Sequence, residues 1–422
     1  MTNLQDLITN AKDTFDLTNP EDQESLYTLT NTLLDNEAIT LSEVQAKARE
    51  SETPLEFKIA AKLMDSRLYM QSITKPLHIA VVFGMWGEQN RLRPRSADNP
   101  NGEDALRVKL EQMAWATAGT PVNWTLYPVD DGCPYDSGKL AQEIAADHPL
   151  GAHVNVMFLA NALPADSGPL KTLESANDSR KAGAVILGAM QAIEDGANAV
   201  MYTDADNSVH LGQLGLLLRP YIEQNVRVVL GNRKHPDAVL VKEGARWGIG
   251  IKVLRHMQRM VGHEIFGRDI KDTQAAFKLY DRDVLSKIIA EPTVFDFSFD
   301  TDWIAGALSM DEKFVKVPFA FIDSAAESAS AKQMPMTTWE TLLLGLLKSM
   351  RRYNLLKTEG SQRMAQVLDK EIHDYKDLEL LIDHLPAELE SAGEADYGNP
   401  EVMTPEALQA WIQQRKQEDA QN

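Results

Sequence analysis

The sequence predicts an α/β protein with a doubly wound, mixed but mainly parallel sheet and added helical regions at its N- and C-terminal ends. Apolar, β-rich runs alternate with helical stretches through the middle of the chain, which is the pattern of a parallel sheet covered by helices on both faces. Neither end of the chain shows this alternation, and both show apolar residues at helical spacing. We therefore expect an N-terminal helical region at 1–75, an α/β domain at 76–330 and a C-terminal helical region at 331–422.

The N-terminal region is predicted to be helical from the spacing of its leucines. Leu26, Leu29 and Leu33 recur on one helical face, and the polar run 19–22, which contains a proline, is typical of a helix start. A second amphipathic helix is expected between residues 54 and 70. The C-terminal region has the same character, with helices expected at 364–368, 378–385 and 405–413.

The central region supplies the predicted sheet and its covering helices. The expected strands are 77–83, 122–129, 154–159, 199–203 and 226–230. The expected helices between them lie near 103–118, 139–146, 180–196 and 211–223. Ligands of such sheets bind at the carboxyl ends of the strands, so the residues that follow each strand are the candidates for chemistry.

Composition excludes several classes of protein. Of the 422 residues 44% are hydrophobic and 25% charged, as in a globular protein, and a net charge of −20 disfavours a nucleic-acid binder. The single cysteine, Cys133, favours a reducing compartment. Residues 1–10 lack the features of a signal peptide, and no apolar run approaches the roughly 20 residues of a membrane span. We expect a cytoplasmic enzyme.

Carboxylates and an arginine follow three of the predicted strands. The segments are Asp130-Asp131-Gly132, Asp204-Ala205-Asp206 and Gly231-Asn232-Arg233. A single carboxylate after a strand can simply cap a helix or close a turn. Two carboxylates one residue apart repel each other unless a cation compensates them. A divalent ion that also binds phosphates would do so, which makes Asp204 and Asp206 candidates for a metal–diphosphate site.

These segments and three later ones resemble a family-2-type glycosyltransferase with the GT-A fold. The segment 272–280, DTQAAFKLY, resembles the Asp-Thr-Gln-x-Gly-Phe-Lys-Leu-Phe motif of dolichyl- and polyprenyl-phosphate sugar transferases. Residues 297–303, FSFDTDW, and the expected edge strand at 315–318 resemble the segments that follow it. The resemblance implies a GT-A-like sheet, a nucleotide-sugar donor and Mg2+ or Mn2+ as cofactor.

The sequence departs from that family at several positions. The usual Pro-x-x-Asn-Glu after the first strand is replaced by residues 83–91, FGMWGEQNR, which precede a polar insertion. The family glycine is Ala276 here, and its glutamate is Asp302. The C-terminal membrane segments of the family are missing. The donor half of the site is therefore better matched than the acceptor half.

The resemblance implies roles on the donor side, each with a structural alternative. Asp130 would bind the base and Asp131 would shape the turn. Arg180 and Lys181 would lie near the base and diphosphate, or simply start a helix. Asp206 would bind the metal directly, and Asp204 the ribose and metal-bound water. Arg233, and by proximity Arg246, would hold phosphate, because a guanidinium can donate two parallel hydrogen bonds.

The later motifs would form the sugar and acceptor side. Asp272, Thr273 and Gln274 would line the sugar pocket and Lys278 would add positive charge, while the same segment could be an amphipathic strand with Phe277 and Leu279 buried. Asp300 and Asp302 lie where inverting enzymes of this fold carry an acceptor-side carboxylate. A hydroxyl acceptor requires such a base, whereas a phosphate acceptor does not.

The predicted function is an inverting, metal-dependent transfer of a sugar from a nucleotide sugar to an acceptor. That acceptor is either a phosphate-bearing molecule, such as a polyprenyl phosphate, or a soluble one. The alternatives are a sugar-1-phosphate nucleotidyltransferase and a non-catalytic nucleotide-sugar-binding protein. The segment 336–353 is apolar with a basic end, so it fits either a helix in the protein core or peripheral contact with a membrane surface.

Overall fold

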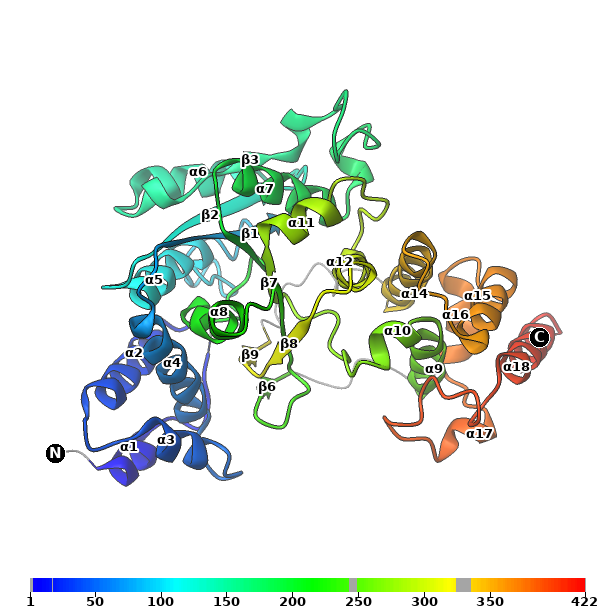
Figure 1. The fold of residues 1–422 in the computed structure, drawn as a ribbon, viewed down its shortest axis with the longest axis horizontal. Helices are drawn as coiled ribbons and strands as arrows, with labels where there is room; N and C mark the ends of the chain where they lie inside the picture. Colours follow the sequence, from blue (N-terminus) through cyan, green and yellow to red (C-terminus); the bar gives the residue numbers. More distant parts are fainter. Residues whose placement is uncertain (1–2, 17, 243–248, 324–334, 422) are drawn as a thin grey trace. The chain divides into compact units, whose positions relative to one another are not determined.

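The computed structural model describes residues 3–16, 18–242, 249–323 and 335–421 (Figure 1). The chain divides into two compact units. Unit 1 contains residues 1–243, 275–291 and 313–327, and unit 2 contains residues 244–274, 292–312 and 328–422. The chain passes repeatedly between them, whereas the division predicted from the sequence was linear, with boundaries after residues 75 and 330.

Four helices open unit 1. They are α1 (Leu4–Asn10), α2 (Pro20–Asp35), α3 (Leu41–Ala48) and α4 (Leu55–Ser72). The two predicted from the sequence are α2 and α4, and α1 and α3 were not predicted individually. The side chain of Asn19 caps α2 by accepting a hydrogen bond from the N–H of Glu21, and Thr40 and Glu43 form a capping box at α3. Apolar side chains of these helices, among them Leu26, form one core.

A seven-stranded sheet follows, in the order β3-β2-β1-β4-β7-β5-β8. Its strands are β1 (Leu77–Met85), β2 (Val122–Asp130), β3 (Met157–Phe158), β4 (Ala199–Thr203), β5 (Val228–Gly231), β7 (Phe277–Asp281) and β8 (Phe314–Val317). All neighbouring strands pair in parallel except β7, which is antiparallel to β4 and β5. The predicted mixed, mainly parallel sheet is confirmed, with β8 at its edge.

Helices cover both faces of this sheet (Figure 1). They are α5 (Ala105–Thr117), α6 (Ser137–Asp147), α7 (Ala182–Glu194), α8 (Leu214–Glu223) and α11 (Arg282–Ile288). Side chains alternate between the faces of a strand. In β1, Val81 lies in one core with Leu110 of α5 and Leu217 of α8. Its neighbour Val82 lies against Gly188 of α7 on the opposite face.

Several short elements of unit 1 differ from the expectation. β3 is only two residues long, because the rest of 154–159 makes a single bridge to β2 and then a 3-10 turn. A two-stranded parallel sheet, β6 (Val239–Val241) with β9 (Ala320–Ile322), was not predicted. The 3-10 helices of the unit are Gly151–His153, Leu159–Ala162, Ala176–Asp178 and Leu211–Gln213.

Unit 2 is helical in its described residues. Its helices are α9 (Ile251–Val261), α10 (His263–Phe266), α12 (Phe299–Ser309), α14 (Pro335–Arg352), α15 (Glu359–Glu371), α16 (Tyr375–Ile382), α17 (Ala387–Glu390) and α18 (Pro405–Asp419). The helical character expected of the C-terminal region is confirmed.

The apolar face of α14 is buried inside unit 2. Trp339, Leu343 and Met350 are among its buried residues, and α14 packs on α12 and α16. Of the two roles that the sequence allowed for 336–353, a core helix or contact with a membrane surface, the structure shows the core helix. No helix in the described ranges is long and apolar enough to cross a membrane.

Candidate functional site

The predicted donor residues of unit 1 gather at one edge of the sheet. β1, β2 and β4 run parallel, so their carboxyl ends lie at the same edge. The last residue of β1, Met85, lies opposite Asp130, the last residue of β2, and Asp204 directly follows β4. We call this the carboxyl edge. It is where ligands bind in open α/β sheets.

Asp130 holds the loop that follows β2. Its Oδ1 accepts a hydrogen bond from the N–H of Cys133 at 2.8 Å, and its Oδ2 accepts one from the N–H of Gly138 at 2.7 Å, in the first turn of α6. The carboxylate is buried. These are the contacts of a turn and cap residue, which is the structural alternative that the sequence left open. Contact with a nucleobase stays a prediction.

Asp131 links the end of β2 to the start of α7. Its Oδ2 accepts a hydrogen bond of 2.7 Å from the backbone N–H of Lys181. Burial raises the pKa of Asp131 to about 6, although the Ser179 hydroxyl and the Lys181 N–H both act to lower it. The charge of Asp131 therefore changes close to neutral pH.

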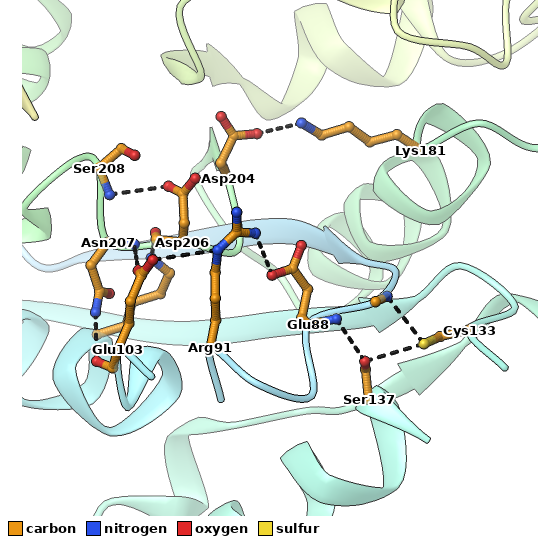
Figure 2. A network of polar contacts seen from close by, with 12 residues as sticks. Glu88, Arg91, Glu103, Cys133, Ser137, Lys181, Asp204, Asp206, Asn207 and Ser208 are labelled. Atoms are coloured by element: carbon orange, nitrogen blue, oxygen red, sulfur yellow. Dashed lines mark hydrogen bonds and ion pairs between the residues drawn. The ribbon is translucent and has the colours of Figure 1, made fainter. Parts of the chain in front are cut away.

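Lys181 is fixed at its backbone and at its ammonium group. Its backbone has φ 87° and ψ −45°, a left-handed conformation that costs free energy for any residue with a side chain. The ammonium forms an ion pair with Oδ1 of Asp204 (Figure 2). A strained residue held by two carboxylates at a ligand-binding edge is a candidate functional residue. The prediction placed Lys181 near the diphosphate, and the structure brings it to Asp204.

Positive charge surrounds Asp204. Burial alone would raise the pKa of Asp204, but the Lys181 ammonium, with smaller contributions from Arg233 and Lys109, outweighs burial and lowers that pKa below its usual value. The hydroxyl of Tyr202 donates a hydrogen bond of 3.4 Å to Oδ1 of Asp204. The Arg233 guanidinium lies 4.9 Å from the centre of the Phe321 ring. Asp204 is therefore ionised at neutral pH.

Lys278 occupies the interior of the sheet beside this group. It is fully buried in β7, opposite Tyr202 of β4, and its Nζ donates a hydrogen bond of 2.5 Å to the carbonyl of Ala275. The ammonium lies 5.9 Å from the centre of the Tyr202 ring. Phe277 and Leu279 are buried as expected, but the strand is not amphipathic, since Lys278 is buried too.

Asp206 presents a carboxylate at the turn after β4. Its Oδ1 accepts a hydrogen bond of 3.0 Å from the N–H of Ser208, and its carbonyl accepts one from the fully buried ammonium of Lys109 on α5. The side chain is half-buried. The turn is therefore anchored from beneath by Lys109, while the carboxylate can accept further ligands.

The described residues do not form a complete metal cage, since no cluster of three or more histidine, cysteine or acidic side chains suited to a metal is found among them. Mg2+ in proteins is often held by one or two carboxylates, with waters and substrate phosphates as the other ligands. Asp204 and Asp206 fit that arrangement. They do not fit a site that holds a metal tightly without substrate.

A buried cluster of Glu88, Arg91 and Glu103 lies beside Asp206 and was not predicted (Figure 2). We call it the acid–arginine cluster. Arg91 Nη1 donates to Glu88 Oε2 at 2.7 Å, and Arg91 Nε lies 3.4 Å from Glu103 Oε1. Glu103 Oε2 accepts a hydrogen bond of 2.8 Å from the N–H of Asn207, next to Asp206. The cluster thus fixes the turn that carries the candidate metal ligand.

The acid–arginine cluster also adds charge near that turn. Burial opposes ionisation of Arg91, but Glu88, Asp206 and Glu103 outweigh it and raise the pKa of the guanidinium above its usual value. Burial raises the pKa of Glu88 despite the neighbouring Arg91. Glu88 and Arg91 occupy the segment that replaces the usual motif of the family, and that replacement was the one signal that could have identified them.

Cys133 joins the loops that follow β1 and β2. Its Sγ accepts a hydrogen bond of 3.2 Å from the N–H of Gly87 and lies 3.2 Å from the hydroxyl of Ser137. Two exposed aromatic side chains, Trp86 and Tyr135, flank this connection with their ring centres 6.0 Å apart. They form an apolar rim on the carboxyl edge that the sequence analysis did not single out.

Other predicted residues lie in unit 2, where two contacts involve helix α12. Gln274 Nε2 donates a hydrogen bond of 3.0 Å to the hydroxyl of Thr301. Asp302 is 2% exposed, and its Oδ2 accepts a hydrogen bond of 2.9 Å from Nη1 of Arg352 on α14. Burial raises the pKa of Asp302, although Arg352 acts to lower it. Asp302 is therefore one partner of a buried ion pair between α12 and α14.

The structure brings seven predicted residues together around the carboxyl edge and the strands behind it, namely Asp130, Asp131, Lys181, Asp204, Asp206, Arg233 and Lys278. Arg180 precedes α7 and is exposed. Asp272, Thr273 and Asp300 are buried in unit 2. Arg246 lies outside the described residues.

Comparisons with solved structures find partial similarity at low identity. No protein-family model matches the chain. The crystal structure of mannosyl-3-phosphoglycerate synthase from Rubrobacter xylanophilus has 13% identity and a TM-score of 0.45, over 71% of this chain and 80% of that chain. Glucosyl-3-phosphoglycerate synthase from Mycobacterium tuberculosis, solved with Mn2+, UDP and glucosyl-3-phosphoglycerate, has 13% identity and a TM-score of 0.45, over 68% and 83%.

A third structure, described only as a mycobacterial protein, has 12% identity and a TM-score of 0.46, over 68% of this chain and 78% of that chain. None of these three descriptions names a polyprenyl phosphate. At such identities a likeness concerns the fold alone, so the chemistry of this chain has to be argued from its own residues.

Proposed function

We propose that this protein is a metal-dependent glycosyltransferase that moves a sugar from a nucleotide-sugar donor to a phosphate-bearing acceptor. The observation that carries the proposal is the pair Asp204 and Asp206 at the carboxyl edge, with the Lys181 ammonium on one of them. The two carboxylates lie two residues apart after one strand and repel each other, and Lys181 forms an ion pair with Asp204 whereas Asp206 has, among the described residues, only the more distant charges of Arg91 and Lys109. A divalent ion shared with a diphosphate would compensate both.

The residues around this pair fit the charge that develops in the reaction. Breaking the sugar–phosphate bond leaves negative charge on the departing nucleoside diphosphate. Mg2+ or Mn2+, when bound, would supply Lewis-acid stabilisation of that charge. Arg233 can donate two parallel hydrogen bonds to a phosphate, and Lys181 can turn from Asp204 toward the same group. Asp206 would hold the metal, and Asp204 would orient the donor.

The burial of Asp302 favours an acceptor that is already a nucleophilic anion. A general base must reach the proton that it removes. Asp302 is almost fully buried and ion-paired to Arg352, so it is poorly suited to that task. An acceptor that attacks through a phosphate oxygen does not require it, and Asp302 and Asp300 would then only support the acceptor side. A lipid phosphate and a small soluble phosphate share this chemistry.

The decisive experiment separates donor binding from catalysis. Calorimetry with UDP and Mn2+, the ligands bound in the similar synthase structure, should show heat only when both are present. Asp206→Asn should abolish the metal-dependent binding. Asp147→Asn, which changes an exposed carboxylate of the same unit, should leave binding unchanged.

Activity is read as nucleoside diphosphate released from a panel of nucleotide sugars, with polyprenyl phosphate in liposomes and phosphoglyceric acid as the two acceptors. Transfer to the lipid, to the soluble acid or to neither distinguishes the two acceptors, and the linkage in the product shows whether a phosphate or a hydroxyl oxygen attacked the sugar. The anomeric configuration of the product tests the predicted inversion. Pyrophosphate release from a nucleoside triphosphate and a sugar phosphate, without any transfer, would overturn the proposal.

A further inference from the structure

A cavity lies in unit 1, and none of the residues placed above in the donor site lines it. It has a volume of about 390 Å3 and opens between α3, α4 and the segment that leads into β6. Pockets that bind small molecules start at about 300 Å3. Its lining includes Arg49, Lys58 and Lys62 on one side and Asp65 and Asp237 on the other.

Both acidic residues of this cavity are already paired with arginine. Asp237 accepts two hydrogen bonds from Arg49, at 2.9 Å from Nε and 3.0 Å from Nη2. Asp65 Oδ1 accepts one of 2.6 Å from Arg219, and its Oδ2 accepts one of 3.0 Å from Gln45. Because each carboxylate is already paired with an arginine, the two carboxylates offset the charge of the cavity's two lysines only in part.

The two lysines are placed to act together. Lys58 and Lys62 are four residues apart on α4 and so lie on one face of the helix. Lys58 Nζ donates to the carbonyl of Ser51 at 2.9 Å, which neutralises no charge. The Lys62 ammonium makes no hydrogen bond or ion pair with any residue that the structure describes. Burial lowers the pKa of Lys62, although Asp237 and Asp65 act to raise it.

This excess of positive charge stands out in a chain whose net charge is −20. A partly buried cation without a partner costs desolvation free energy that a bound anion would recover. The remaining wall is apolar, with Leu55, Val239 and Pro318. The cavity thus combines two ammonium groups with an apolar wall, and its volume is large enough for a small metabolite.

We propose that this cavity is a binding site for a small phosphate ester. Lys62 and Lys58 hold the phosphate, and the apolar wall contacts the carbon skeleton. Arg49 keeps Asp237 from repelling the ligand. The inference does not depend on the proposed sugar transfer, because it uses none of the residues of the carboxyl edge.

Labelling with pyridoxal 5′-phosphate tests the site on the full chain. This probe carries a phosphate and forms a Schiff base with unprotonated lysines, and borohydride reduction makes the bond permanent for peptide mass spectrometry. We expect Lys62 to be labelled at least tenfold faster than the exposed Lys75. Inorganic phosphate should protect Lys62 and leave Lys75 unprotected. Equal labelling of the two lysines, or no protection by phosphate, would overturn the proposal.

Calorimetry gives an independent measurement with inorganic phosphate as the ligand. Lys62→Met, which keeps most of the length of the side chain and removes its charge, should weaken phosphate binding at this site at least tenfold, and Lys75→Met should not. Arg233→Met should leave the protection of Lys62 intact, which separates this site from phosphate binding at the carboxyl edge. Should Lys62→Met fail to fold, the labelling of the unmodified protein still decides.

Discussion

The backbone N–H of Lys181 donates a 2.7 Å hydrogen bond to Asp131, so a carboxylate at the end of β2 fixes the residue that precedes α7. The ammonium of the same lysine is paired with Asp204 after β4. One strained residue thus connects the ends of two strands of the sheet. The ammonium of Lys181 can also change its partner, from Asp204 to a bound diphosphate.

Lys181 should contribute to donor binding through its charge and to stability through its backbone. A hydrogen bond to a charged group contributes about 1.5–3 kcal/mol, so Lys181→Met should weaken binding of UDP with Mn2+ by about 10- to 100-fold. Lys181→Gly should weaken it equally. The glycine variant should nevertheless be more stable than the methionine variant by about 1 kcal/mol, because glycine adopts φ 87° without strain.

The two variants separate the roles in one pair of measurements, calorimetry for binding and urea unfolding for stability. If Lys181→Met binds the nucleotide as tightly as the unmodified protein, then the ammonium serves only to balance Asp204. If the two variants are equally stable, the backbone conformation costs nothing.

Asp131 should make the stability of unit 1 depend on pH. Its pKa of about 6 in the folded protein is above the usual value of 3.8, so folding favours the protonated form. The contribution of Asp131 to stability is therefore complete below about pH 4 and is lost as the pH rises through 6, with a total of about 3 kcal/mol. Asp131→Asn keeps an acceptor for the Lys181 N–H and cannot titrate.

Urea unfolding between pH 4 and pH 7 measures this contribution. The free energy of unfolding of Asp131→Asn should fall less with rising pH than that of the unmodified protein. Parallel curves for the two proteins would mean that the carboxylate gains enough compensation in the folded state to keep its usual pKa.

The sequence is most informative where one local pattern decides the structure. The run 199–203 is apolar without interruption, and β4 has these bounds. The carboxylates that follow it lie at the carboxyl edge because β4 ends there. The antiparallel insertion of β7 between β4 and β5 depends on pairing between segments far apart in the chain, which no local pattern encodes.

Buried charge was the main feature that the sequence could not predict. Lys278 lies in a strand whose alternation predicted an exposed side chain, yet it is buried, and its ammonium donates a hydrogen bond to the carbonyl of Ala275. The acid–arginine cluster combines Glu88 and Arg91 with Glu103 from the far end of a polar insertion. Only the folded chain shows that these charges compensate one another, since an insertion rich in charge usually predicts a solvated loop.

Arg91 should be essential to the stability of the carboxyl edge. Its removal takes away the cation that contacts both buried carboxylates, Glu88 and Glu103, and breaking such a buried arrangement costs about 3–5 kcal/mol. We expect Arg91→Met to lower the free energy of unfolding by this amount. The exposed Arg93 provides the matched control, and Arg93→Met should change stability by less than about 0.5 kcal/mol.

A second substitution checks the cause of that loss. Adding Glu88→Gln to Arg91→Met removes one of the uncompensated carboxylates, so part of the lost stability should return. The result to look for is a double variant more stable than Arg91→Met alone. A further loss instead would indicate that Arg91 acts through packing of its stem and not through its charge.

Asp302 and Arg352 allow the acceptor chemistry to be tested together with stability. Asp302→Asn breaks the buried ion pair between Asp302 and Arg352, so it should destabilise the protein by a few kcal/mol. Arg351→Met is the control, because the neighbouring Arg351 pairs with Asp369 at the surface, where an ion pair contributes at most about 1 kcal/mol.

Turnover should behave differently from stability. If a phosphate oxygen of the acceptor is the nucleophile, the folded Asp302→Asn protein should keep most of its kcat, since that nucleophile needs no base. If kcat instead falls by about 100-fold while KM for the donor is unchanged, Asp302 acts as a general base and the acceptor is a hydroxyl.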